Sequence, residues 1–206
     1  MLHLSQSPTQ STIRHGHYRL EFRHVQDRWQ HELAICCQDR WRPILTSREG
    51  TPAEVVPASP VWQDLRLESL SDDVAEFQLM GQAGEGVYSA AIRLDGSRRE
   101  VFFDLCARGK RGDSSICQQC RYDLSSETLW REGSNSLLPT ITGHFGAWGL
   151  HVEPHSLENQ PQADCRLEGT PAARLIVGCL EGAGKSDSSR GRSVRWQYRI
   201  SLDGEP

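Results

Sequence analysis

The sequence has no excess of positive charge and almost no lysine. Its 23 Lys and Arg residues are outnumbered by 27 Asp and Glu residues, which gives a net charge of -4. Without a general positive field the chain has little means of displacing counterions from DNA or RNA, so we expect no nucleic-acid partner. Only Lys110 and Lys185 are lysines, and the arginines are scattered singly rather than gathered in a basic patch.

Long apolar runs are also missing. No stretch has the hydrophobic length that a membrane span needs, so we expect no membrane partner. The N-terminus has no basic region followed by an apolar one, which argues against a secretory signal. The seven cysteines are odd in number and irregular in spacing. We therefore expect reduced thiols in a cytoplasmic protein, and no cofactor.

Helix signals are scarce, whereas alternation of polar and apolar residues is common. In HYRLEFRHV, residues 17–25, Tyr18, Leu20 and Phe22 occupy one face of an extended chain. An Asp-Gly pair at residues 95–96 lies between two alternating segments and is typical of a hairpin turn. The helix candidate is SSETLWREG, residues 125–133, which starts with capping serines and lasts barely two turns.

These patterns predict an all-β fold, namely an antiparallel β-sandwich of roughly ten strands with at most one short helix. We expect a single sandwich domain over residues 15–206, preceded by a disordered polar tail over residues 1–14. Residues 43–60 contain four prolines, which predicts a long unpaired connection. The pattern does not indicate an oligomeric state.

A glycine-rich stretch, GCLEGAGKSDSSRG at residues 178–191, is similar to a phosphate-binding loop but departs from its spacing. A P-loop needs glycine five residues before Gly184, and the chain has Cys179 there. The motif also needs a helix after Lys185, whereas a polar stretch and then an alternating strand follow. We interpret this stretch as a Gly/Ser hairpin loop.

The cysteines offer an incomplete metal site. Cys117 and Cys120 form one C-x-x-C pair, and Cys106 ends a nearby predicted strand. Structural zinc requires four ligands, and no second pair with suitable spacing is present. We expect no bound metal and retain Cys106, Cys117 and Cys120 as the candidate ligands should one bind.

The stretch GHFGAWGLHVEPH, residues 143–155, places His151 and Glu153 on one face of a predicted strand, beside His144. Imidazole and carboxylate groups on one face are suited to proton transfer at a sugar hydroxyl. They are equally typical of a solvated strand, and both interpretations stay open.

Six tryptophans are the main indication of ligand binding. Indole faces stack on sugar rings and on cations, and Trp41 and Trp148 fall in predicted loops where such faces are accessible. Arg108, at the end of a predicted strand, adds a planar donor group for a polar ligand.

The segments SPVWQDLRLE, LMGQAGEGVYSAAIRL and VFFDLCAR lie in the central third of the chain. Over residues 59–108 they resemble a small family of uncharacterised bacterial proteins, which carries a proline-containing run with Gln-x-Leu, a G-x-A-G turn and an F-D strand ending in Arg. The resemblance implies no activity, because the family has none assigned. Its strand-rich pattern is similar to carbohydrate-associated β-sandwiches of the mutarotase type, which implies a likeness of fold alone.

Three functional hypotheses follow. The leading one is a non-catalytic module that binds a carbohydrate or another small molecule through Trp41, Trp148 and Arg108. The alternatives are a sugar epimerase or mutarotase-like enzyme, with His144, His151 and Glu153 as acid and base, and a metal-stabilised structural protein that uses the three cysteines named above.

Overall fold

The computed structural model describes residues 1–51, 54, 57–109, 116–133, 139–158, 163–169, 174–179 and 193–204, and it confirms an all-β fold. The described residues form sixteen strands in two antiparallel sheets of eight. The first sheet has the order β1 (His3–Ser7), β2 (Gln10–His15), β3 (Tyr18–Val25), β4 (Arg28–Cys37), β5 (Arg40–Ser47), β10 (Gln119–Leu124), β15 (Arg174–Cys179), β14 (Ala163–Glu168). The second has the order β11 (Leu129–Gly133), β12 (Thr140–Phe145), β13 (Trp148–His155), β16 (Ser193–Asp203), β9 (Glu100–Arg108), β8 (Gly86–Asp95), β7 (Val74–Ala83), β6 (Asp64–Leu70).

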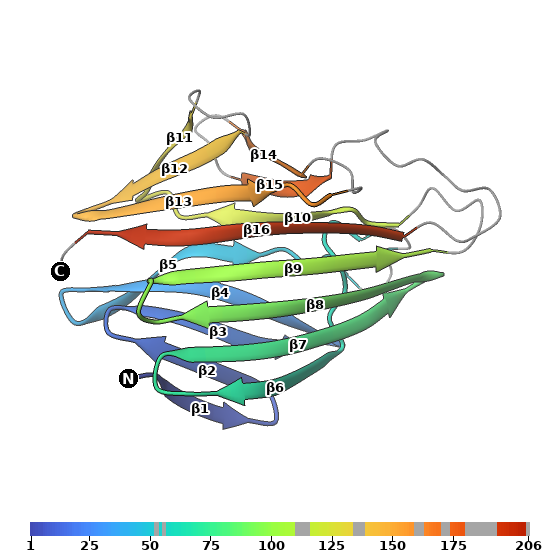
Figure 1. Ribbon diagram of the computed structural model, residues 1–206, viewed down its shortest axis with the longest axis horizontal. Coiled ribbons are helices and arrows are strands. Elements are labelled where there is room, and N and C mark those ends of the chain that lie inside the picture. Colours follow the sequence, from blue (N-terminus) through green and yellow to red (C-terminus); the bar gives the residue numbers. More distant parts are fainter. Residues whose placement is uncertain are drawn as a thin grey trace.

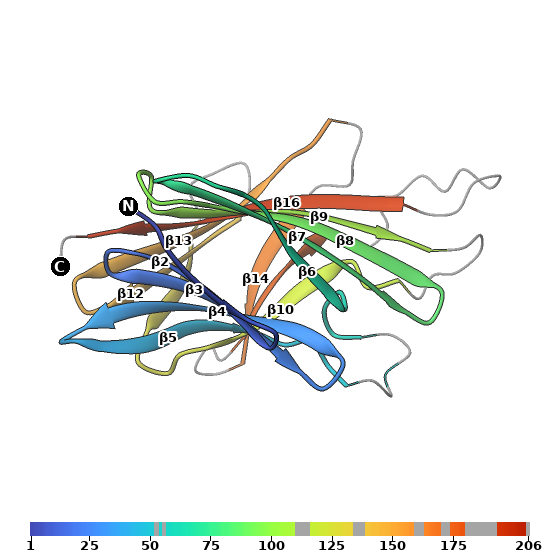
Figure 2. The same ribbon diagram turned by 90° about the horizontal axis from the view of Figure 1, so that it is seen from below.

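The two sheets lie face to face and enclose one hydrophobic core (Figures 1 and 2). Phe22 of β3 packs against Phe77 of β7 across the core, with ring centroids 4.9 Å apart. The hydroxyl of Tyr18 on β3 donates a hydrogen bond to the backbone oxygen of Asp95 on β8, at 3.1 Å. Contacts of both kinds join the layers, as expected for a sandwich-like packing of two sheets.

Alternation along the strands accounts for this arrangement. Along β9 the buried residues Val101, Phe103, Leu105 and Ala107 alternate with more accessible ones. Side chains two apart project from the same face of a strand, so the apolar set faces the core and the polar set faces solvent. The alternation that the sequence shows in β8, β9 and β16 is therefore confirmed. In β3 the apolar face is as expected, but Glu21 on the opposite face is also buried, where it pairs with Arg19 and Arg23.

The expectation of a disordered tail over residues 1–14 is wrong. These residues form β1 and most of β2, and β2 pairs with β3 along its whole length. Ile13 of β2 is fully buried and lies opposite Leu20, and Leu4 of β1 packs against the same core, so a few apolar side chains anchor a mostly polar hairpin. The expected count of roughly ten strands is also too low. Short polar strands are stabilised by pairing with a neighbouring strand and show little alternation of their own, so the sequence pattern does not reveal them.

The proline-containing connection and the short helix also differ from expectation. β5 occupies part of the predicted unpaired segment, and Pro43 falls where the register with β4 shifts, a position at which its missing N–H is tolerated. In place of the helix over residues 125–133, a turn leads from Ser125 into β11. Within the described part of the chain, no helix is long and apolar enough to cross a membrane.

Candidate functional site

A pocket of about 680 Å³ opens at one end of the molecule, between the two sheets. The β4–β5 hairpin of the first sheet and the β12–β13 hairpin of the second both have their tips at this end (Figures 1 and 2). The β2–β3 turn and the turn before β11 complete the wall. The lining residues are His17, Cys36, Cys37, Gln38, Asp39, Arg42, Glu127, Phe145, Gly146, Ala147 and Trp148.

Two tight turns shape the pocket walls. In the β4–β5 turn both central residues, Gln38 and Asp39, have positive φ, at 51° and 61°. This is the pattern of a type I′ turn, which usually contains Asn and Gly. In the β12–β13 turn only the first central residue, Gly146, has positive φ, at 58°, as in a type II′ turn. The first turn therefore holds two side chains in a conformation that such residues seldom adopt, and strain of this kind clusters at functional sites.

The pocket combines aromatic rings with charges of both signs. Trp148 and Phe145 are largely buried in the wall, and the ring of His17 lies 6.1 Å from that of Trp148. Arg42 forms an ion pair with Glu127 at 3.7 Å, and both side chains are about half exposed. An exposed pair of this kind contributes little to folding, roughly 0.2–1 kcal/mol, so its groups are available to a ligand at low cost.

Two adjacent thiols, Cys36 and Cys37, also line the pocket. Burial raises the pKa of the Cys37 thiol above its usual value. A raised pKa disfavours the thiolate, so Cys37 contributes a neutral, weakly polar surface rather than a nucleophile at neutral pH.

The three residues expected to bind a ligand do not lie together. Trp148 lines the pocket, whereas Trp41 does not. Trp41 is on β5, opposite Cys36 of β4. The guanidinium of Arg19 lies over its ring, 5.1 Å from the ring centroid. Arg108 is the last residue of β9, which ends at the opposite end of the molecule (Figure 1). The structure thus separates the expected binding set.

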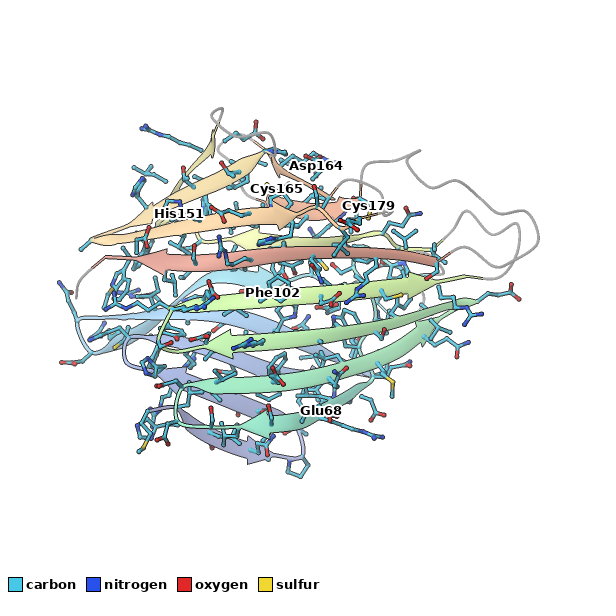
Figure 3. All side chains as sticks on the ribbon, viewed as in Figure 1. Glu68, Phe102, His151, Asp164, Cys165 and Cys179 are labelled. Carbon is cyan, nitrogen blue, oxygen red and sulfur yellow. The ribbon has the colours of Figure 1, made fainter. Side chains whose placement is uncertain are left out.

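The expected acid and base residues share the outer face of the second sheet, as the alternation indicates. On β13 the inward side chains are Leu150, Val152 and Pro154, so His151 and Glu153 project outward from this sheet, whose strands lie in front in Figure 3. His151 pairs with Asp203 at 3.0 Å. Glu153 pairs closely with Arg199, which also approaches Glu100.

His144 is exposed on β12 and lies opposite Gly149 of β13. None of the three expected acid and base residues lines the described pocket. His151 and Glu153 are members of cross-strand pairs on a solvated sheet face, and His144 lies on the same face.

The candidate metal ligands also diverge. Cys106 is on the outer side of β9, where its sulfur lies 3.6 Å from the Ser193 hydroxyl. Cys117 and Cys120 are buried. Burial raises the pKa of Cys117 to about 12 and that of Cys120 well above its usual value. Among the described residues, no three His, Cys, Asp or Glu side chains are grouped so as to hold a metal ion.

Most of the pocket residues were not singled out from the sequence. One signal was available: the tetrapeptide QDRW occurs at residues 26–29 and again at residues 38–41. Both copies begin at a hairpin turn, after β3 and after β4, and Gln26 and Gln38 both have positive φ. The repeated tetrapeptide therefore marks the turn before β4 and the turn before β5. Of the stretch at residues 178–191 that is predicted to be a loop, Gly178 and Cys179 instead belong to β15, and residues 180–191 lie outside the described residues.

No protein-family model matches this chain, and no curated protein is significantly similar to it.

Proposed function

We propose that this protein is a binding module for a small polyhydroxylated ligand of the carbohydrate class, held in the pocket between the β4–β5 and β12–β13 hairpins. The observation that supports it is the composition of the pocket wall, where Trp148, Phe145 and His17 stand beside the Arg42–Glu127 pair. Apolar ring faces suit the C–H side of a sugar, and planar charged groups suit its hydroxyls. A volume of about 680 Å³ is in the range of pockets that enclose small ligands.

The proposal is one of binding rather than catalysis. The histidines of the second sheet face away from the pocket, and at the pocket itself Glu127 is paired with Arg42 while the ring of His17 lies beside that of Trp148. A reducing, cytoplasmic setting would suit the seven cysteines, all of which are free thiols.

A thermal-shift screen against neutral mono- and disaccharides tests the proposal. A saccharide present at about 100 times its Kd stabilises the folded state by about 2.7 kcal/mol. In a chain of this size that corresponds to a rise in Tm of roughly 5–10 °C. We expect at least one saccharide to raise Tm in this way.

The variant Arg42→Gln should abolish the shift, because it removes the cation of the pocket while costing little stability. Arg48→Gln is a closely matched control: Arg48 pairs with Asp123 at 3.7 Å, and its exposure is nearly that of Arg42, but it is not a pocket residue. Trp148→Phe should weaken binding, and Trp41→Phe should leave it unchanged. If no saccharide shifts Tm, or if Arg42→Gln and Arg48→Gln respond alike, the proposal is wrong.

A further inference from the structure

Four polar side chains form a chain through the hydrophobic core, away from the pocket. His31 of β4 and Tyr122 of β10 project inward from the first sheet, and Tyr198 of β16 projects inward from the second. Glu49 follows the end of β5, and its side chain is completely buried. The three ring residues are at most 5% exposed. A polar group in such surroundings is costly unless it has a hydrogen-bond partner.

The distances connect these groups in one order. The Glu49 Oε1 atom lies 3.6 Å from His31 Nδ1, and His31 Nε2 lies 2.9 Å from the Tyr122 hydroxyl. The Tyr122 hydroxyl is in close contact with the Tyr198 hydroxyl. Phe103 stacks on Tyr198 with ring centroids 4.6 Å apart and lies 5.6 Å from the His31 ring, which fixes both rings in place. The chain therefore runs Glu49, His31, Tyr122, Tyr198, from the first sheet to the second.

The number of protons decides the direction of these hydrogen bonds. A neutral histidine has one N–H and one acceptor nitrogen. If Glu49 is protonated it donates to Nδ1, His31 donates from Nε2 to Tyr122, and Tyr122 donates to Tyr198. If Glu49 is ionised it accepts from Nδ1–H, so that Nε2 becomes the acceptor, Tyr122 donates to it and Tyr198 donates to Tyr122. In the structure, His31 Nδ1 and both Glu49 carboxyl oxygens are buried without a hydrogen-bond partner, and they face one another across 3.6 Å. A closing movement of about 0.5 Å makes the hydrogen bond in either arrangement and satisfies the histidine.

The surroundings of Glu49 favour the protonated form. Burial raises the pKa of Glu49 to about 8, while the Ser47 hydroxyl and the Arg28 guanidinium act in the opposite direction. Burial also lowers the pKa of His31 to about 3, so an imidazolium is disfavoured. The thiols of Cys117 and Cys120, from the segment before β10 and from β10 itself, also act on this region and are neutral because burial raises their pKa.

We propose that Glu49, His31, Tyr122 and Tyr198 form a reversible hydrogen-bond relay in which the proton on Glu49 sets the tautomer of His31 and the direction of every hydrogen bond in the chain. At neutral pH the hydrogen bonds run from Glu49 towards Tyr198. Loss of the proton in mildly alkaline solution reverses them and leaves a negative charge in the core. The direction of the hydrogen bonds that join the two sheets here therefore depends on the pH of the solution.

The sign of the stability change follows from proton linkage. An unfolded chain releases the Glu49 proton near the ordinary glutamate value of about 4.5, whereas the folded chain keeps it to about 8. Between these values the folded state binds more protons, so stability falls as pH rises. In the upper part of this window, between about pH 6.5 and 7.5, the unfolding equilibrium constant should rise about tenfold from this group, and the rise levels off above about pH 8.

Nitrogen-15 NMR of the His31 ring tests the relay directly. In the wild type we expect Nε2–H at about pH 6 and Nδ1–H at about pH 9.5, with a midpoint near the folded pKa of Glu49. In Glu49→Gln the side-chain amide donates to Nδ1 at every pH, so His31 should keep the Nε2–H tautomer throughout. The tenfold change in the unfolding constant should also be absent from Glu49→Gln.

A second measurement needs no variant at the relay. Infrared spectra of the wild type at about pH 7 should show the carbonyl band of a protonated carboxylic acid, which disappears at alkaline pH. Tyr18→Phe removes another hydrogen bond between the sheets and is the control, since it should leave the His31 midpoint unchanged. A single His31 tautomer from pH 6 to 9.5 in the wild type would overturn the proposal, as would the absence of the carboxylic-acid band.

Discussion

Replacing Gly81 by alanine should destabilise the protein far more than the loss of a single hydrogen atom suggests. Gly81 lies on β7, where the segment before β6 crosses this strand. A Cβ at this position would lie 2.0 Å from the backbone oxygen of Val61 and 3.0 Å from the backbone nitrogen of Gln63. Because the obstacle is backbone rather than the end of a flexible side chain, the crossing segment has to move.

The cost of this movement can be worked out from the contacts that hold the segment. The Gln63 N–H donates to Met80 O at 2.8 Å, a bond worth about 0.5–1.5 kcal/mol. The Trp62 side chain is 1% exposed, and forcing such a residue out of place costs about 1–3 kcal/mol. Alanine restricts the unfolded chain and returns about 0.4–1 kcal/mol. The midpoints of these ranges give a net loss of about 2 kcal/mol, a fall in Tm of roughly 4–8 °C.

Gly149→Ala is the matched control. Gly149 lies on a strand of the same sheet, and an added Cβ would have its nearest neighbours at 3.6 Å, which is ordinary contact. Its Tm should stay within about 2 °C of the wild type or rise slightly. Urea unfolding followed by tryptophan fluorescence measures both variants. If the free energies of unfolding of Gly81→Ala and Gly149→Ala agree within about 0.5 kcal/mol, the crossing of the two backbones is not as tight as the structure indicates.

Three further outcomes are expected. Gly178→Ala should cost about as much as Gly81→Ala by the same urea assay, because its Cβ would lie 2.5 Å from Gln118 O and 2.7 Å from the Cα of Gln119. Burial lowers the pKa of His31 to about 3, so the folded state excludes a proton that the unfolded state binds below about pH 6.5. Glu49 opposes this contribution down to about pH 4.5, so the net fall in stability should appear between about pH 4.5 and 3, and His31→Gln should lose it in the pH–Tm curve. Thiol titration of the native protein should leave the buried thiol of Cys117 unreacted until denaturant is added, and a fast reaction there would contradict its burial.

The sequence predicted the fold class because the signal for it is local. Alternation in β3, β8, β9 and β16 records which face of each strand is apolar, and this needs no knowledge of the neighbouring strands. The same rule placed His151 and Glu153 on one outer face. It failed for β1, β2, β5, β10 and β11, whose polar or short sequences become strands because a partner completes their hydrogen bonds.

The candidate site could not be predicted in this way. Its residues come from four turns and the strand ends beside them, which are separated in the sequence. Arg42 meets Glu127 only because β5 pairs with β10, which precedes the turn at Ser125. The expected set of Trp41, Trp148 and Arg108 was chosen by residue type, which carries no information about which end of a strand or which side of a sheet a residue occupies.

By itself, then, the sequence determined that extended strands with one apolar face would pack around a core, since that follows from the period of two along each strand. Only the tertiary structure decided which strands are neighbours, and with them the pocket at one end and the path from Glu49 to Tyr198. The physical reason is that every strand offers the same backbone donors and acceptors, so hydrogen bonding alone allows the strands to pair in any order. The order that forms depends on the packing of the whole chain.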